Sequence, residues 1–198
     1  MATATAMTAS TIVVVDKPHG RAYVNSIGFD FPGGEFRPGL VALVDSDGSV
    51  RTVAEGLAFP NGMAVTEDNS TLIIAESFAG KLTAFGIADD GGLTHRRTFA
   101  EVLADGICMD AEGAVWTPSW YDGGPCCLRV ADGGRVLDRI PLEQAGFACA
   151  LGGTDGRTLF VADSEVSGVR TVAFSREAGS RQVGRLVGVA GEPVAGQL

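Results

Sequence analysis

Two short motifs in this chain join an oxygen-bearing side chain to a glycine. Pro60-Asn61-Gly62 begins one apolar stretch, and Asp105-Gly106 begins another. Amide and carboxylate oxygens suit Ca²⁺, Mg²⁺ or Mn²⁺ and do not suit a thiophilic metal. If the fold brings Asn61 and Asp105 together, the pair predicts a divalent-cation site. Asn-Gly and Asp-Gly are also common turn dipeptides, so the residues alone leave an ordinary turn as the alternative.

The elements that would position this pair form an internal repeat. Each of four copies has a short apolar stretch, a polar turn rich in Asp, Asn and Gly, and a second apolar stretch. The copies cover residues 11–26, 61–77, 105–119 and 148–164, and their starts are 50, 44 and 43 residues apart. Each copy predicts a β-hairpin. Further hairpins are predicted at 39–56, 81–102 and 127–142.

Four strands in each period of about 40–50 residues is the pattern of a β-propeller blade. We therefore expect an all-β fold with about four blades, and an irregular β-sandwich is the alternative. Equivalent positions in successive blades face one axial channel, so Asn61 and Asp105 are expected to converge from neighbouring blades. A flexible leader is expected over 1–10, and one propeller domain over 11–198.

Composition excludes several classes of partner. The chain carries a formal net charge of −9 at pH 7, which argues against nucleic acid because phosphate binding needs clustered Lys and Arg. No apolar run approaches the ~18–20 residues of a membrane span, and residues 1–10 lack the features of a secretory signal. The four cysteines form neither a disulfide framework nor a CxxC motif, so a reducing, cytoplasmic location is expected; they are Cys108, Cys126, Cys127 and Cys149.

Further polar and aromatic residues could line a channel between such blades. Glu76 and Ser77 end one predicted strand, and Trp116 and Trp120 belong to another. A capped strand end is the simpler interpretation of the first pair. Packing between blades is the simpler interpretation of the two tryptophans.

Four stretches of the chain resemble the senescence-marker-protein (regucalcin)/gluconolactonase/luciferin-regenerating-enzyme family: GLAFPNGMAVTEDNSTLIIAES, THRRTFAEV, DGICMDAEGAVWTPSWYDGG and FACALGGTDGRTLFVADS. The resemblance covers nearly all of residues 12–175 in the family's order. It implies a six-bladed β-propeller that hydrolyses lactones of sugar acids. It also implies one divalent cation at the channel mouth, with Ca²⁺ preferred and Zn²⁺, Mn²⁺ or Mg²⁺ as alternatives.

The resemblance also assigns roles to individual residues. Asn61 matches a metal-binding asparagine of the family. Asp105 matches the aspartate that contacts the metal and exchanges protons with the substrate. Asp30, in GFDFPGG, falls close to an acidic position that contacts substrate.

The chain departs from the family pattern at its start. The family's first blades have no counterpart here. These blades include a glutamate near the N-terminus that serves as a metal ligand in the family, so this ligand is missing as well. Thr11 and Ile12 stand where the family has an Asn-Asp pair. We therefore expect an N-terminally truncated propeller that keeps two of three protein ligands. Its open edge could pair with a second chain.

The expected function is a divalent-metal-dependent hydrolase of sugar-acid lactones. Water would attack the lactone carbonyl, the cation would act as a Lewis acid, and Asp105 would exchange protons. The alternative is a catalytically impaired or inactive family fragment that binds a divalent cation or a small sugar-acid ligand. A third interpretation is a protein-interaction propeller with an exposed apolar edge at 11–15.

Overall fold

Four antiparallel sheets make up the described part of the chain. The computed structural model describes residues 12–165, 168–175 and 184–186. Within them sixteen strands form four sheets of four, and each sheet takes its strands in chain order. No α-helix occurs among the described residues, and the only helical turns there are two short 3-10 turns, η1 (Lys17–His19) and η2 (Ser77–Ala79). The predicted all-β fold is confirmed.

Each sheet follows one of the predicted repeats. The first sheet contains β1 (Val13–Asp16), β2 (Arg21–Ser26), β3 (Gly39–Val44) and β4 (Val50–Leu57). The second contains β5 (Pro60–Val65), β6 (Thr71–Glu76), β7 (Lys81–Ile87) and β8 (Leu93–Ala100). The repeat hairpins become the first two strands of each sheet, because their Asp, Asn and Gly turns let the chain reverse tightly.

The remaining two sheets repeat this plan. The third sheet contains β9 (Cys108–Met109), β10 (Val115–Tyr121), β11 (Gly124–Val130) and β12 (Val136–Pro141). The fourth contains β13 (Gly146–Gly152), β14 (Thr158–Glu165), β15 (Gly168–Ser175) and β16 (Gly184–Leu186). The predicted leader at 1–10 and residue Thr11 lie outside the described residues.

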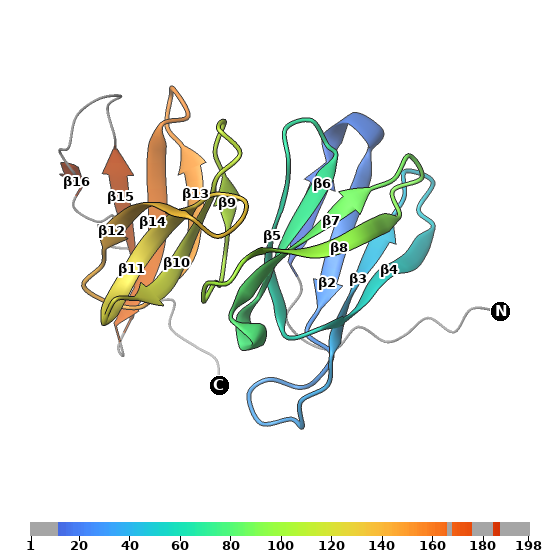
Figure 1. Cartoon of the computed structure of the whole chain (residues 1–198), viewed down its shortest axis with the longest axis horizontal. Helices are drawn as coiled ribbons and strands as arrows, with labels where there is room; N and C mark the ends of the chain where they lie inside the picture. Colours follow the sequence, from blue (N-terminus) through green and yellow to red (C-terminus); the bar gives the residue numbers. More distant parts are fainter. Residues whose placement is uncertain (1–11, 166–167, 176–183, 187–198) are drawn as a thin grey trace.

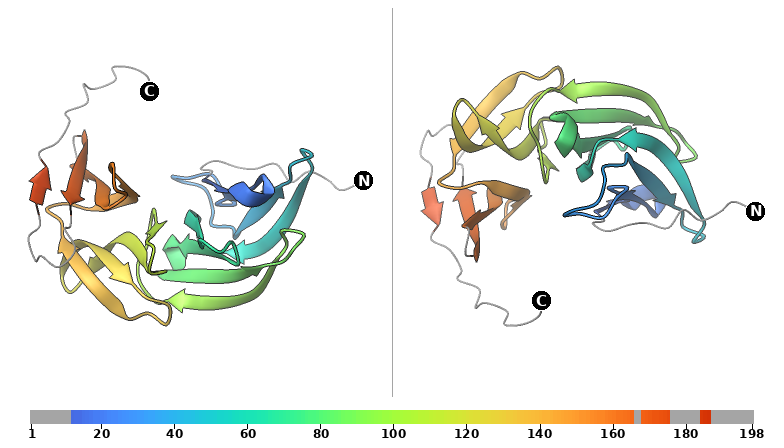
Figure 2. Two further views of the ribbon diagram at one scale, coloured as in Figure 1. Left: turned by 90° about the horizontal axis from the view of Figure 1, so that it is seen from above. Right: turned by 90° about the horizontal axis from the view of Figure 1, so that it is seen from below.

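The sheets follow one another around an arc, as blades do (Figures 1 and 2). The first strands of successive sheets lie against one another, β1 with β5, β5 with β9 and β9 with β13. Figure 2 shows these strands on the concave side and the fourth strands on the outer side. The described part of the chain therefore forms four blades of an open propeller arc.

Apolar clusters between successive blades hold the arc together. Neighbouring residues of β6 point in opposite directions: Ile74 packs with Tyr23 and Leu43 of the first blade, whereas Ile73 packs with Val115 of the third. This alternation follows from the two-residue period of a strand, and it explains why β6 is apolar on both faces. Each fully buried side chain of this size contributes about 1.5–3 kcal/mol, so stability comes mainly from blade-to-blade packing.

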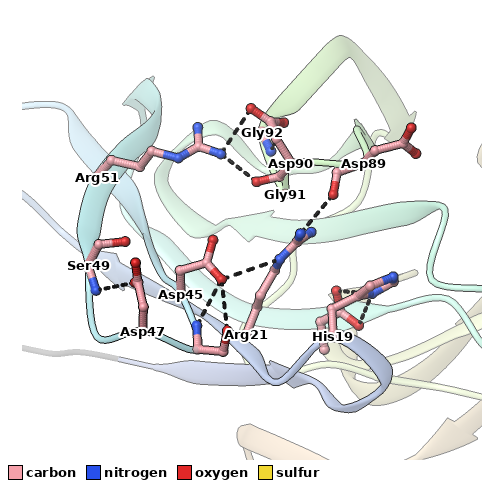
Figure 3. A network of polar contacts seen from close by, with 12 residues as sticks. His19, Arg21, Asp45, Asp47, Ser49, Arg51, Asp89, Asp90, Gly91 and Gly92 are labelled. Atoms are coloured by element: carbon pink, nitrogen blue, oxygen red, sulfur yellow. Dashed lines mark hydrogen bonds and ion pairs between the residues drawn. The ribbon is translucent and has the colours of Figure 1, made fainter.

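A polar contact also joins the first two blades (Figure 3). The turn at 88–92 between β7 and β8 accepts three hydrogen bonds from the first blade through its carbonyl oxygens. Arg21 donates to Asp89 at 2.7 Å and Arg51 donates to Asp90 at 2.5 Å. The buried hydroxyl of Tyr23 donates to Gly91 at 3.0 Å. These contacts fix the turn against its neighbour at the end remote from the candidate site.

All four first strands begin at one end of the molecule, the lower end in Figure 1. The connections after the second strands and between blades lie at the same end, because strand direction alternates within each blade. They include the connections at 27–38, 77–80 and 101–107. Of the described part of the predicted apolar edge, Val13 and Val15 are exposed.

Candidate functional site

Asn61 and Asp105 meet at the boundary between the second and third blades. Asn61 is the second residue of β5, and Asp105 lies in the connection between β8 and β9. The side-chain amide of Asn61 donates a hydrogen bond to Oδ1 of Asp105. The backbone N–H of Gly62 donates to the Asp105 carbonyl at 3.1 Å. The structure therefore brings together the two residues that the sequence predicted to converge.

Two glycines permit this close approach. A Cβ atom at Gly62 would lie 2.4 Å from the Ile107 nitrogen and 2.6 Å from the Asp105 carbonyl oxygen. A Cβ atom at Gly106 would lie 2.7 Å from Cα of Ala148 in the fourth blade. All three distances involve backbone atoms, which cannot move as a flexible side chain can. The glycines after Asn61 and Asp105 thus allow neighbouring blades to pack closely, and they do not only allow the chain to turn.

The segment carrying Asp105 is also held by the fourth blade. The Gly106 N–H donates to the Phe147 carbonyl at 2.8 Å. The Thr117 hydroxyl, from β10, donates to the Gly106 carbonyl at 3.2 Å. Three blades therefore contribute to the position of Asp105.

Asn25 is a residue of this region that the sequence analysis missed. It is fully buried near the end of β2. Its amide group donates to the Asn61 carbonyl at 2.6 Å, and its Oδ1 accepts the N–H of Ile12 at 3.1 Å. Asn25 therefore joins the starts of β1 and β5. The signal was an asparagine near the end of an apolar strand, where a buried amide needs partners.

The carboxyl group of Asp105 is partly desolvated. Burial raises the pKa of Asp105 from its ordinary value near 3.8 to about 6. Among the described residues, no Lys, Arg or His forms an ion pair with it; its side-chain partner is the neutral Asn61. A partly buried carboxylate without a cationic partner favours a bound cation, because desolvation disfavours an isolated charge.

The donor set fits part of a hard-cation site. One carboxylate and one amide supply oxygen, which is the ligand chemistry of Ca²⁺ and Mg²⁺. The described residues contain no group of three or more His, Cys, Asp or Glu able to hold a metal ion. Asn61 and Asp105 therefore fit as two ligands, and the remaining positions would fall to water, substrate or groups outside the described chain.

Asp30 is not joined to this pair. It lies exposed in the connection at 27–38, and its carbonyl accepts the Gly34 N–H at 2.7 Å. None of the contacts among the described residues links its side chain to Asn61 or Asp105. Its role in substrate binding stays a prediction.

Glu76 belongs to a structural network. Its carboxylate accepts hydrogen bonds from the Ala58 N–H at 2.8 Å, Thr83 Oγ1 at 2.5 Å and Arg96 at 3.0 Å. Burial alone would raise its pKa, but these donors outweigh burial and lower the pKa of Glu76 below its ordinary value. The carboxylate therefore fixes the strand end, as the simpler interpretation predicted. Ser77 likewise donates to a backbone carbonyl, that of Ala104, at 2.9 Å.

The two tryptophans differ in environment. Trp116 is buried with Cys127, Leu159 and Val161 between the third and fourth blades. This agrees with the packing interpretation. Trp120 lies exposed near the end of β10, at the lower end of the molecule. It is therefore accessible to a ligand, unlike Trp116.

Within the described residues, no helix is both long and apolar enough to cross a membrane.

Known proteins with related sequences and folds include lactonases and regucalcins. The pentonolactonase of Haloferax volcanii is 31% identical over 157 residues, covering 75% of this chain and 51% of the relative. The regucalcin of Danio rerio is 26% identical, covering 89% and 62%. The solved structure of a gluconolactonase from Xanthomonas campestris is 28% identical with a TM-score of 0.64, covering 77% of this chain and 53% of that one.

The chain thus spans about half the length of the pentonolactonase that it matches. The profile of the SMP-30/gluconolactonase/LRE-like region matches residues 13–165, from β1 to the end of β14. This match includes Asn61, Thr117 and Phe147, the residues of three blades that hold the segment of Asp105. The chain therefore belongs to the SMP-30/gluconolactonase/LRE-like family.

Proposed function

We propose that this chain carries the catalytic half of a lactone hydrolase, with Asp105 as the proton-exchanging group. The observation that supports it is the contact between Asn61 and Asp105 across two blades. The relatives named pentonolactonase and gluconolactonase support the reaction class. Sugar-acid lactones are therefore the first substrates to test.

The residues would act as follows. Asp105 accepts a proton from water as the water oxygen attacks the lactone carbonyl carbon, and it returns a proton to the alkoxide when the ring C–O bond breaks. Asn61 and Gly62 hold Asp105 in one orientation. When bound by Asn61 and Asp105, a divalent cation would act as a Lewis acid toward the carbonyl oxygen. Ca²⁺ suits these oxygen donors, with Zn²⁺, Mn²⁺ and Mg²⁺ as alternatives.

A second candidate is a family member that binds a cation or a small sugar-acid ligand without turnover. The small number of protein ligands favours binding without turnover. Ca²⁺ takes six to eight oxygen ligands, and the described residues offer only two candidate protein ligands, Asn61 and Asp105. Weak cation binding without hydrolysis would identify this function.

The test combines thermal melting with a lactonase assay. We expect Ca²⁺, Mn²⁺ or Zn²⁺ to raise the Tm relative to EDTA, because a ligand of the folded state stabilises it by mass action. Asp105→Ala should abolish both the shift and the hydrolysis of glucono- and pentonolactones. Asp89→Ala is the control, because Asp89 is exposed and lies in the connection between β7 and β8, at the end of the molecule opposite the site.

Two other outcomes decide between the candidates. A metal shift without hydrolysis would favour the binding function. A Tm indifferent to metal, with no hydrolysis, would contradict both. Size-exclusion mass in the same samples tests the further proposal that the open edge pairs with a second chain.

A further inference from the structure

Exposed apolar side chains gather at the lower end of the molecule, around the candidate site. Six large ones are between 49% and 57% exposed. They lie in connections or strand ends of all four blades at that end (Figure 1). We call this set the apolar rim: Phe31, Phe36, Phe78, Leu103, Trp120 and Phe147.

Several rim residues are tied directly to the segment of Asp105. Leu103 precedes Asp105 by two positions. Phe78 follows Ser77, whose hydroxyl donates to the Ala104 carbonyl at 2.9 Å. Phe147 accepts the Gly106 N–H through its carbonyl at 2.8 Å. Three of the six rim residues therefore adjoin the segment of Asp105: one in the second blade, one in the connection to the third blade and one in the fourth blade.

The rings on the first two blades are ordered by mutual packing. Phe59, which immediately precedes Pro60-Asn61, stacks on Phe78 with ring centroids 4.4 Å apart and an interplanar angle of 18°. Phe36 stacks on the same ring at 6.1 Å and 29°. Phe29 contacts Phe31 and Phe36 edge-on. Because the rings are already packed, little side-chain entropy is lost when a ligand contacts them.

Polar groups near the pair are mostly engaged within the protein. Both functional groups of the Asn25 amide have partners. Both carboxylate oxygens of Glu76 and the Ser77 hydroxyl are hydrogen-bonded. At the same end the buried Ser119 hydroxyl and the buried Oδ1 of Asp163 are the exceptions, because neither has a partner among the described residues. A polyhydroxylated ring would thus find few free partners here and would lose hydrogen bonds to water.

We propose that the apolar rim binds an apolar substituent of the substrate, so that the site prefers alkyl- or aryl-substituted lactones over polyhydroxylated ones. This inference rests on the proposed lactone hydrolysis, but it changes the preferred substrates from sugar-acid lactones to lactones with an apolar substituent. A lipid surface is the competing occupant of an exposed aromatic patch. The substrate is favoured because Leu103, Phe78 and Phe147 of the apolar rim adjoin the segment of Asp105, and because a net charge of −9 repels anionic membranes.

The test compares substrates that share one ring. They are γ-butyrolactone, γ-hexalactone and γ-decalactone, with D-ribono-1,4-lactone as the polyhydroxylated member, assayed with the wild-type chain and added Ca²⁺ or Mn²⁺. We expect kcat/KM to rise with chain length by at least about tenfold from γ-butyrolactone to γ-decalactone, because each buried methylene adds binding free energy. D-ribono-1,4-lactone should be the poorest substrate.

Two rim variants from different blades separate binding from folding. Trp120→Ala and Phe36→Ala should each reduce the ratio of kcat/KM between γ-decalactone and γ-butyrolactone by about threefold or more. Val50→Ala is the control, because Val50 is a large apolar residue, 63% exposed, at the opposite end of the molecule. It should leave the ratio unchanged. Circular dichroism melts confirm that each variant is folded.

The outcomes distinguish failure of this inference from failure of the proposed lactone hydrolysis. Hydrolysis that favours D-ribono-1,4-lactone, or a ratio unaffected by both rim variants, would overturn the inference and keep the lactone hydrolase. Hydrolysis of no lactone at all would remove both. Co-sedimentation with phosphatidylcholine vesicles that Trp120→Ala abolishes would assign the apolar rim to a lipid surface and overturn the inference.

Discussion

The side-chain amide of Asn61 donates to the carboxylate of Asp105 across the boundary between two blades. Neither residue is positioned by its own hairpin alone. Asn61 is held from the first blade by Asn25, and Asp105 is followed by Gly106, which is held from the fourth. The site is therefore a product of blade-to-blade contacts, and substitutions that alter those contacts should change it.

Replacing Gly62 tests the close approach of the second and third blades. Gly62→Ala would place a methyl group 2.4 Å from the Ile107 nitrogen and 2.6 Å from the Asp105 carbonyl oxygen. Since backbone must shift, we expect a loss of about 1–3 kcal/mol in the free energy of unfolding. The metal-dependent Tm shift should also weaken. Urea unfolding and the melt with and without EDTA measure the two effects.

Gly124→Ala is the matched control for that change. Gly124 also lies near a strand end, but its nearest neighbour to a new Cβ is a side-chain atom of Arg139 at 4.0 Å. We expect little or no loss of stability there. An equal loss in the two variants would contradict a specific steric requirement at Gly62.

Removing the charge of Glu76 tests the network at the end of β6. Glu76→Gln keeps the shape but replaces one acceptor by a donor facing Thr83 or Arg96. We expect a loss of about 2–3 kcal/mol at pH 7, because the buried carboxylate loses its charge-assisted hydrogen bonds. Urea unfolding measures the loss. Glu67→Gln, at an exposed turn position, should change it by less than about 0.5 kcal/mol.

The same variant has a defined pH dependence. The pKa of Glu76 is lowered in the folded state, so its contribution to stability is present above its unfolded pKa and is lost as the pH falls through its folded pKa. The stability gap between wild type and Glu76→Gln should therefore narrow in acid. A gap that stays constant from pH 7 to pH 3 would refute the network.

The hydroxyl of Tyr23 provides the corresponding test at alkaline pH. Burial, assisted by the nearby charge of Asp16, raises the pKa of Tyr23 to about 12, and the hydroxyl donates to Gly91 of the next blade. Tyr23→Phe should cost about 1 kcal/mol at pH 7. The raised pKa means that the contribution of the protonated Tyr23 hydroxyl to stability is fully present below pH 10. The stability advantage of wild type over Tyr23→Phe should therefore disappear between pH 10 and about pH 12. Urea unfolding of both proteins across this range measures it, and a pH-independent difference would contradict it.

The sequence predicted the elements whose signal is periodic. Alternating apolar residues around Asp- and Gly-rich turns identified the hairpins, and their recurrence predicted that Asn61 and Asp105 lie on neighbouring blades. Glycine after each of them was read as a turn signal, whereas the structure shows that it also allows close contact with another blade. That function depends on which backbone lies opposite, and spacing along the chain does not reveal it.

Irregular segments carried less information. The connection at 27–38 has no strand or helix period, so the packing of its phenylalanines against Phe59 and Phe78 could not be derived. Asn25 and Glu76 have similar places in their blades but different partners. Those partners are side chains and backbone groups far away in sequence. Only the folded arrangement identifies Asn25 as a support for Asn61 and Glu76 as part of a charged network.

Thiol reactivity tests the packing between the third and fourth blades. The sulfur atoms of Cys108 and Cys149 lie 3.6 Å apart at this boundary. The contact with Cys149, together with burial, raises the pKa of the Cys108 thiol above its usual range. Because the thiolate is the reactive form, we expect Cys108 to react slowly with a disulfide reagent such as DTNB at pH 8. Cys126 and Cys127 are fully buried and should be slow as well.

The reference for this measurement is an exposed thiol in the same protein. Asp89→Cys adds one at a surface turn, and it should react far faster than the four native cysteines, which should all react once the chain is unfolded in guanidinium. Cys108→Ser, added to the Asp89→Cys protein, should then lower the amplitude of the slow phase by one thiol. It should leave the fast phase of the introduced thiol unchanged. If the wild-type chain already showed a fast phase that Cys108→Ser removed, the boundary between the third and fourth blades would be open in solution, and the hold of the Phe147 carbonyl on the segment of Asp105 would be lost with it.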